Sequence, residues 1–244
     1  MRLQLMTWPQ VEAYLASKNA VIIPIGSTEQ HGPTGLIGTD ALCAEAIAQR
    51  VGERLDVVVA PTIDVGMAQH HMAFPGSLTL RPSTLMAVLR DTLLSLSHHG
   101  FQRIFVINGH GGNTATIQAA FAETQMELDR MTPRPDLRTK LANWWDSPAV
   151  DKLASALYGD ATGSHATPPE VAVTWALHPE LADQHRLVPP VAPNGPFFGA
   201  ADFRASFPDG RIGSNPSLAT PEAGLQFLET SVDELAGMAG RFFA

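Results

Sequence analysis

The sequence lacks the features of a disulfide-bonded, membrane-spanning or secreted protein. Its only cysteine is Cys43, so an internal disulfide is excluded and a reducing compartment is permitted. No stretch approaches the roughly 20 apolar residues that a membrane-spanning helix needs. The first ten residues, MRLQLMTWPQ, lack the apolar segment and small-residue cleavage site of a secretion signal. We therefore expect a cytoplasmic protein without a membrane partner.

Charged residues are also scarce. They make up 16% of the 244 residues, and the formal net charge is −8. A net acidic chain lacks the basic face that nucleic acids and anionic membranes require, so we expect neither as a partner. Apolar residues make up 45% of the chain, which is enough to bury a core. At this length we expect a single domain over residues 1–244.

Apolar runs alternate with helical patterns along the sequence. The predicted strands are 21–25, 57–60, 104–107 and 137–145. The predicted helices are 7–17, 41–55, 83–100, 114–130, 168–177 and 221–243. Strands that alternate with helices imply an α/β fold of three layers, α/β/α, with a mostly parallel central sheet. Residues 187–220 lack periodicity and predict a long surface excursion or an oligomer contact.

Polar residues gather in two loops that follow predicted strands, at 26–40 and 108–113. Because ligands of such folds bind at the carboxyl ends of the strands, loops some 80 positions apart can meet there. A third polar segment lies at 163–170. Together the three segments hold three carboxylates and three imidazoles, namely Glu29, His31, Asp40, His110, His165 and Glu170.

These six side chains are enough to ligate two divalent metal ions. Nitrogen and oxygen ligands without thiolate suit Zn²⁺, Mn²⁺ or Fe²⁺, with Zn²⁺ our first expectation. Two such ions about 3.5–4 Å apart could share a bridging hydroxide, a nucleophile at neutral pH. Structural roles stay open for Asp40 as a helix N-cap and for His165 as a core histidine. Glu170 could equally stabilise a helix N-terminus as an anion.

Longer motifs in the chain resemble the creatininase (creatinine amidohydrolase) family. They are IPIGSTEQHGPTGLIGTD, FPGSLTLRP, LSHHGFQRIFVINGHGGN, SHATPPEVAVTWALHPEL and GSNPSLATPEAG. They lie in the family's order over most of the chain, and EQHG…TD with NGHGGN is the most specific combination. The resemblance implies an α/β/α hydrolase with a dinuclear metal centre that cleaves amide-type C–N bonds. It also implies a homo-oligomer, since hexamers built from dimers are known among relatives.

The resemblance also assigns roles to residues. Four of them fall on metal-ligand positions: Glu29, His31, Asp40 and His110. Asp40 would bridge both ions. His165 falls on the position of the proton-shuttling histidine, which would deliver a proton to the leaving nitrogen.

Two departures from the family pattern bear on the substrate. Creatinine-hydrolysing members carry a glutamate ligand where this chain has Gly112. Glu170 is the best replacement, and Asp160 and Asp64 are the next candidates. Those members also cover the substrate with two tryptophans, of which Trp145 matches one. We therefore expect a small amide of the cyclic or formamide type, with creatinine itself, or peptide cleavage as in mycofactocin maturation, as alternatives.

Other residues are expected near the substrate. The backbone N–H groups of Gly111 and Gly112 could stabilise an oxyanion. Trp145 could cover the substrate, and since Trp144 alternates with it along a strand, at most one of the two would face the site. His70 precedes the FPGS motif and could line the pocket mouth.

A rival interpretation from another class is a non-catalytic nucleotide or sugar-phosphate binding module. The glycine-rich turn at 109–113 lies between a predicted strand and a helix N-terminus, where a phosphate can bind. The turn lacks the GxGxxG pattern and a P-loop lysine. This interpretation predicts no bound metal.

Overall fold

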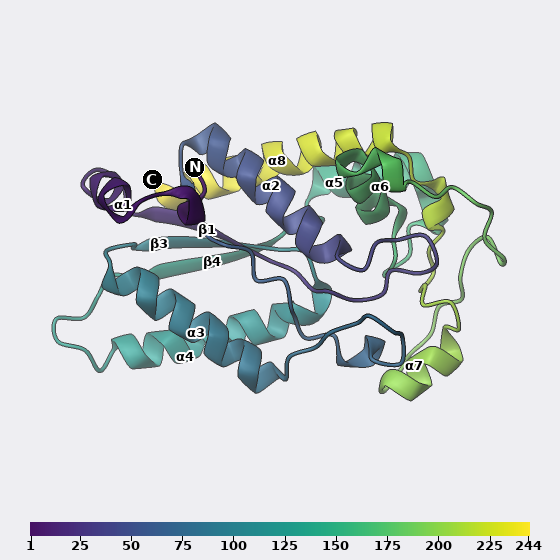
Figure 1. The fold of residues 1–244 in the computed structure, drawn as a ribbon, viewed down its shortest axis with the longest axis horizontal. Coiled ribbons are helices and arrows are strands. Elements are labelled where there is room, and N and C mark those ends of the chain that lie inside the picture. The colour runs from purple at the N-terminus through teal and green to yellow at the C-terminus, as the bar shows by residue number, and fades with distance from the viewer.

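A computed structural model describes residues 1–244. Four parallel strands form one sheet in the order β2-β1-β3-β4. They are Ala20–Ile25 (β1), Val58–Val59 (β2), Arg103–Asn108 (β3) and Arg138–Asn143 (β4). Helices lie on both faces of this sheet (Figure 1), so the predicted three-layer α/β/α fold is confirmed.

The two helical layers differ in size. Helices α3 and α4 lie along one face, and α2, α5, α6 and α8 lie along the other (Figure 1). The helices are α1 (Trp8–Leu15), α2 (Thr39–Leu55), α3 (Pro82–His98), α4 (Thr114–Leu128), α5 (Pro148–Tyr158), α6 (Pro168–Leu177), α7 (Ala200–Ser206) and α8 (Pro221–Phe243). None of them combines the length and apolar character that crossing a bilayer would require.

Strand β1 is buried along its whole length because it contributes to two cores. Successive strand residues point to opposite faces of a sheet. Accordingly, Ile22 packs in the larger core with α2, α6 and α8, whereas Val21 and Ile23 pack in the core with α3 and α4. The all-apolar run therefore reflects burial on both faces, as is usual for central parallel strands.

Two element boundaries and one additional helix differ from the sequence predictions in ways that affect the site. Helix α2 begins at Thr39 with Gly38 as its N-cap, so Asp40 lies in the first turn and is not the cap. Strand β4 ends at Asn143, before the two tryptophans that were predicted to continue it. Helix α5 was not predicted, although Ser147 caps it by accepting a hydrogen bond from the backbone N–H of Val150.

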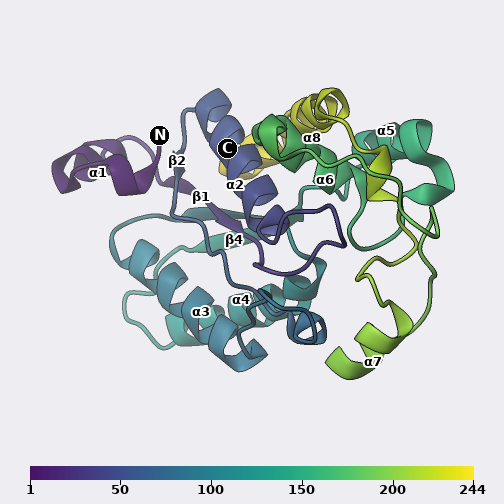
Figure 2. The ribbon, with the colours of Figure 1, turned by 45° about the vertical axis from the view of Figure 1, so that its right-hand side comes forward.

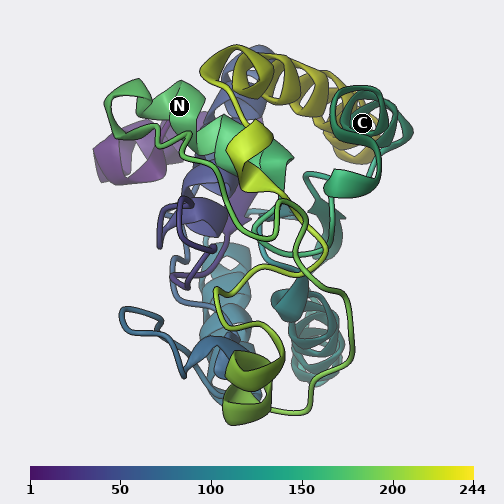
Figure 3. The same cartoon turned by 90° about the vertical axis from the view of Figure 1, so that its right-hand side faces the viewer.

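The long segment predicted as irregular contains a short helix, α7. Figures 2 and 3 show α7 beside the turn at Gln69–His71, and the two segments are in contact. Phe203 of α7 is fully buried there, with its ring 4.8 Å from that of His71. The segment thus covers the loop that follows β2 and closes one side of the region at the carboxyl ends of the strands.

Candidate metal centre

All six predicted ligand and catalytic residues converge at the carboxyl ends of the strands. Glu29 and His31 lie in the loop after β1, and His110 follows β3 directly. Asp40 lies in the first turn of α2, and Glu170 lies in the first turn of α6, five residues after His165. Residues far apart in sequence therefore meet at one edge of the sheet, as the parallel topology predicted.

Two glycines at the strand ends allow the start of α2 to approach the sheet. A Cβ at Gly109 would lie 2.1 Å from the backbone oxygen of Asp40. A Cβ at Gly26 would lie 2.3 Å from the backbone nitrogen of Ala41. Any side chain at either position would push α2 away, so the placement of Asp40 depends on both glycines.

Asp40 lies between two histidines and faces each with a different oxygen. Its Oδ1 is 3.0 Å from His31 Nε2, and its Oδ2 is 3.1 Å from His110 Nδ1. Glu29 completes one cluster with Asp40 and His110, and Glu170 completes a second with His31 and Asp40. Within each cluster the potential ligand atoms lie within 4.8 Å of one another. The two clusters share Asp40.

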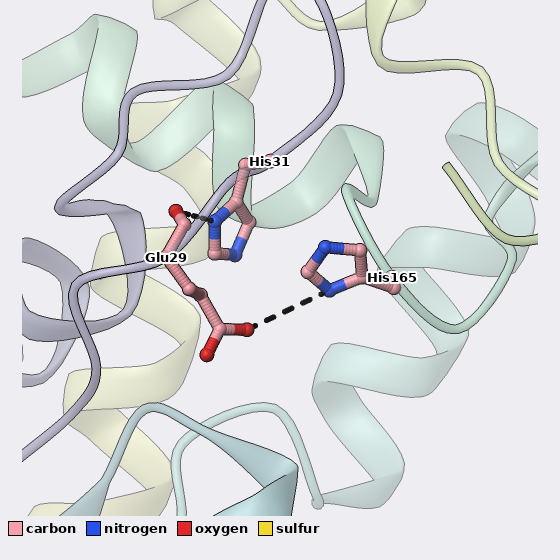
Figure 4. A group of neighbouring side chains, drawn as sticks. All are labelled: Glu29, His31 and His165. Carbon is pink, nitrogen blue, oxygen red and sulfur yellow. Dashed lines mark hydrogen bonds and ion pairs between the residues drawn. The ribbon is translucent and has the colours of Figure 1, made fainter. Parts of the chain in front are cut away.

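A third cluster links Glu29, His31 and His165. Figure 4 shows the Glu29 carboxylate and the His165 ring pointing toward one another, with 3.9 Å between Glu29 Oε1 and His165 Nδ1. The His31 ring lies above them, with Nδ1 3.1 Å from the backbone oxygen of Glu29. That contact leaves the Nε2 atom of His31 facing Asp40.

The carboxylates fit a metal ion because several of their oxygens accept no hydrogen bond, although imidazole nitrogens lie within 3.2 Å of two of them. Both carboxylate oxygens of Glu29 and Oδ2 of Asp40 are buried without a hydrogen-bond partner. Burying an anionic oxygen without a partner is costly. A cation in the clusters would offset this cost, and imidazole and carboxylate ligands suit Zn²⁺ or Mn²⁺.

Opposite charges and burial shift the pKa values of these groups strongly. Burial raises the pKa of Glu29 to about 7 and that of Glu170 to about 6. Burial would lower the pKa values of both histidines, but neighbouring carboxylates outweigh it and raise that of His31 to about 10 and that of His110 to about 9. Burial opposes ionisation of Asp40 too, yet the same two histidines hold its pKa well below the usual range. In the metal-free protein, the positive charges of protonated His31 and His110 therefore offset much of the negative charge of the carboxylates.

His165 is a neutral imidazole whose protonated nitrogen can be assigned. Its Nε2 lies 2.9 Å from the backbone oxygen of Gln30, which can only accept a hydrogen bond. The proton therefore lies on Nε2, and Nδ1 faces Glu29 with a lone pair. Burial and the nearby His71 and His31 hold the pKa of His165 well below its ordinary value.

Glu170 combines the two roles that the sequence left open. Its Oε1 accepts a hydrogen bond of 2.5 Å from the backbone N–H of Thr167, which forms a capping box at the start of α6. Its Oε2 lies 3.9 Å from His31 Nε2. The other candidate carboxylates, Asp64 and Asp160, are exposed and belong to none of the clusters.

The position of Gly112 has no room for a side chain. A Cβ there would lie 2.4 Å from His110 Nε2 and 2.7 Å from the backbone oxygen of Met67. The same two atoms form a hydrogen bond of 3.0 Å, which turns Nδ1 of His110 toward Asp40. A glutamate at this position is incompatible with this arrangement of His110.

A cavity of about 430 Å³ opens beside the clusters. It is bordered by potential ligands, by His165 and by apolar side chains, among them Asp40, His110, His165, Glu170, Gly111, Trp144, Trp145, Val150 and Ala154. The prediction that at most one of the two tryptophans faces the site is wrong, because β4 ends before them and strand alternation no longer applies. No lysine or arginine borders the cavity.

Two predicted substrate contacts lie elsewhere. Gly112 faces the His110 ring and is not part of the cavity wall. The His70 ring is also outside this wall and stacks on Phe197, with ring centroids 5.1 Å apart. A contact of either residue with substrate stays a prediction.

Sequence reasoning missed the part that His71 plays in the site. Its Nε2 lies 3.1 Å from Glu29 Oε1, and its side chain is 1% exposed. Burial, together with His70 and other nearby histidines, lowers the pKa of His71 to about 2, so its ring is neutral. The sequence placed His70 and His71 in one polar loop, and only the cover formed by α7 shows which of them is buried.

Comparisons with known proteins identify the family of the chain. The family model for Creatininase, creatinine amidohydrolase, matches residues 4–239. The creatinine amidohydrolase of Pseudomonas putida is 28% identical over 95% of this chain and 93% of its own length. The mycofactocin precursor peptide peptidase of Mycolicibacterium smegmatis is 38% identical over 44% of this chain and 45% of its own.

Solved structures extend the likeness to three dimensions. One described as "Creatininase Mn" superposes with a TM-score of 0.88 at 26% identity, over 99% of this chain and 98% of the other. Fold, motif order and family model therefore agree over nearly the whole sequence, as the motifs predicted. The chain belongs to the creatininase (creatinine amidohydrolase) family and is a hydrolase of that family.

Proposed function

We propose that residues 1–244 act as one metal-dependent amidohydrolase domain that cleaves a cyclic amide or formamide-type C–N bond in a small molecule. The observation that carries this proposal is the pair of clusters that share Asp40 beside a cavity. Glu29, Asp40 and His110 would hold one ion. His31, Asp40 and Glu170 would hold the second. Zn²⁺ is our first expectation, with Mn²⁺ or Fe²⁺ as alternatives.

Ions bound there would polarise a substrate carbonyl and lower the pKa of a water molecule. The chain's own residues complete the chemistry. His165 would take up a proton at Nδ1, the atom that faces the clusters, and deliver it to the leaving nitrogen. Gly111 borders the cavity, where its backbone N–H could stabilise the developing oxyanion.

The cavity supports a small substrate without negative charge. Its volume of about 430 Å³ is in the range of small-molecule sites. Three carboxylates border it, those of Asp40, Asp151 and Glu170, and no lysine or arginine accompanies them. An anionic substrate would meet repulsion from Asp151, which lies outside both clusters. Trp145 offers an apolar face for a planar amide.

The charge of Asp151 gives a test of this selectivity. In Asp151→Lys, we expect kcat/KM for an anionic amide relative to a cationic analogue to rise about tenfold, since one contact changes sign. Asp146→Lys is the matched control, because Asp146 is exposed and does not border the cavity. Equal changes in the two variants would mean that net charge, and not Asp151, sets the preference.

The charged residues around the cavity do not support the rival interpretation, a phosphate-binding module. The cavity beside the glycine-rich turn has carboxylates and histidines on its wall and neither lysine nor arginine. Residues Gly111–Asn113 form a short 3-10 turn ahead of α4. A phosphate in this cavity would lack the lysine and arginine partners that such sites normally have.

Peptide cleavage is the second candidate. The partial match to mycofactocin peptidases favours it, because that match has the highest identity among the relatives described above. A peptide would have to enter the cavity beside Trp145 and α5. Hydrolysis of short peptides in preference to formamides and cyclic amides, creatinine included, would select this alternative.

The first experiment is the metal content of protein purified without chelators or a metal-binding tag. We expect one to two equivalents of Zn, Mn or Fe per chain, and loss of most of the metal in Asp40→Asn. A screen of formamides, cyclic amides and short peptides then follows with the loaded protein. If no metal is present and none is taken up from added Zn²⁺ or Mn²⁺, the metal centre is disproved.

We further propose that the enzyme is cytoplasmic and assembles as a homo-oligomer, for which a hexamer built from dimers is one form known among relatives. The family resemblance supports the assembly. Light scattering of the purified chain tests it, and a monomer at micromolar concentration would contradict it.

A further inference from the structure

Gln30 lies between two buried imidazoles and contacts both of them. Its side-chain Nε2 is 2.9 Å from His71 Nδ1 and 2.9 Å from His165 Nε2, and its backbone oxygen is also 2.9 Å from His165 Nε2. The side chain itself is 5% exposed. Neither Gln30 nor His71 belongs to the two clusters assigned above to the metal ions.

Hydrogen bonds fix the orientation of the Gln30 carboxamide. Its Oε1 accepts a bond of 2.8 Å from the backbone N–H of Gly32, so the other terminal atom is the NH₂ group. One NH₂ hydrogen is donated to the backbone oxygen of Gly210 at 3.0 Å. The second lies near both His71 Nδ1 and His165 Nε2. Because His165 Nε2 donates its own proton to the Gln30 backbone oxygen, it cannot accept a second one, and His71 Nδ1 must accept the hydrogen.

This arrangement determines which nitrogen of each ring carries the proton. Since His71 accepts at Nδ1, its proton is on Nε2, which lies 3.1 Å from Glu29 Oε1. Since His165 donates from Nε2 to the Gln30 backbone, its lone pair is on Nδ1, 3.9 Å from the same Glu29 oxygen. The two rings pack against each other with centroids 4.3 Å apart.

We propose that Gln30 is a positioning residue that fixes the tautomers of His71 and His165, so that the protonated Nε2 of His71 and the unprotonated Nδ1 of His165 are the ring atoms nearest to Glu29. The protonated Nε2 of His71 lies close to Glu29 Oε1 without forming a hydrogen bond to it, so its partial positive charge favours the ionised carboxylate and leaves the oxygen free to bind the metal. The lone pair of His165 stays available to receive a proton. The expected effect on metal binding rests on the proposed metal centre. The tautomers of His71 and His165 do not, because the hydrogen bonds that fix them are present in the metal-free protein.

The substitution Gln30→Glu tests the inference because it replaces the NH₂ donor with an acceptor. The ring of His71 must then carry a proton on Nδ1, whereas His165 keeps its bond to the backbone. We expect ¹⁵N NMR of the metal-free protein to show His71 as the Nε2–H form in the wild type and with a proton on Nδ1 in the variant. The His165 signals should stay in the Nε2–H form in both.

Metal affinity gives the second measurement. Partners that orient metal ligands typically contribute 10–100-fold to affinity, so Gln30→Glu should weaken Zn²⁺ binding about that much in competition with a chelating dye. Gln69→Glu, the same change at an exposed residue beside His71, should bind Zn²⁺ like the wild type. If Gln30→Glu does not fold, His71→Met and His71→Gln replace it. His71→Met lacks a donor and should bind Zn²⁺ more weakly than the wild type. His71→Gln keeps a donor near the Nε2 position and should retain most of the wild-type affinity.

Three outcomes would overturn the inference. They are an Nδ1–H form of His71 in the wild type, unchanged Zn²⁺ affinity in Gln30→Glu, and equal affinity in His71→Met and His71→Gln. Loss of one whole metal equivalent in His71→Met would make His71 a ligand instead. A wild-type chain that binds no Zn²⁺ would disprove the proposed function, while the NMR result would still decide the tautomers.

Discussion

Metal binding should release protons, because the chain holds protons where the ions are expected. With pKa values of about 10 and about 9, His31 and His110 are both protonated at pH 7.5. Each must lose its proton before the ring nitrogen that faces Asp40 can ligate a metal. Loading both clusters at pH 7.5 should therefore release about two protons per chain. Two histidines with ordinary pKa values would together release only about 0.2.

The raised pKa values of the two histidines also determine how metal affinity changes with pH. Because the metal-free chain binds more protons, lower pH favours it and weakens metal binding. The product of the two dissociation constants should rise about 100-fold for each pH unit between about 8 and 7. Below pH 7 the dependence should become steeper, because Glu29, with a pKa of about 7, also takes up a proton.

Calorimetric titration of Mn²⁺ into the chain, in two non-coordinating buffers of different ionisation enthalpy, measures the number of protons released. The control is the same titration into Glu170→Gln, which removes a candidate ligand of the second cluster only, so about half as many protons should be released per chain. Release of less than about half a proton at pH 7.5 would refute the reasoning, because it would mean that the carboxylates do not hold both imidazoles protonated.

Three substitutions test the individual roles. Glu170→Gln should lower metal content toward one ion per chain by elemental analysis, whereas Asp160→Asn, which changes an exposed carboxylate outside the clusters, should retain two. His165→Ala should keep its metal but lose about 10²–10⁴-fold in kcat, and full turnover would remove His165 from the reaction. Gly112→Ala should weaken metal binding at least tenfold because its Cβ displaces the His110 ring, whereas Gly111→Ala, with nothing within 4 Å of its Cβ, should bind metal normally.

The parts of the fold that the sequence predicted are those with strong local patterns. Apolar β-branched runs marked β1 and β3, and clustered polar residues marked the loops after them, so the convergence of Glu29 and His110 followed from parallel topology. Helix α5 was missed even though Val150, Ala154 and Tyr158 recur at four-residue intervals on its buried side. That spacing is typical of one face of a helix and could have predicted α5 from the sequence.

The remaining differences depend on tertiary contacts. Whether Trp144 faces the cavity is decided by the residue at which β4 stops pairing, and strand ends are set by neighbouring chain segments. The burial of His71 depends on Phe203, which lies more than 130 residues later and belongs to a segment without periodicity. No local pattern in the sequence distinguishes His71 from its neighbour His70.

The apolar part of the cavity wall and most of the candidate ligands come from different parts of the chain. Glu29, Asp40 and His110 belong to the loop after β1, the start of α2 and the loop after β3, whereas Trp145 and Ala154 belong to the turn after β4 and to α5. Mutations in α5 can therefore change the size and polarity of the cavity while the reactive centre keeps its geometry. One hydrolytic centre can thus be adapted to new substrates by exchanging a single helix, which makes α5 the segment to randomise in directed evolution.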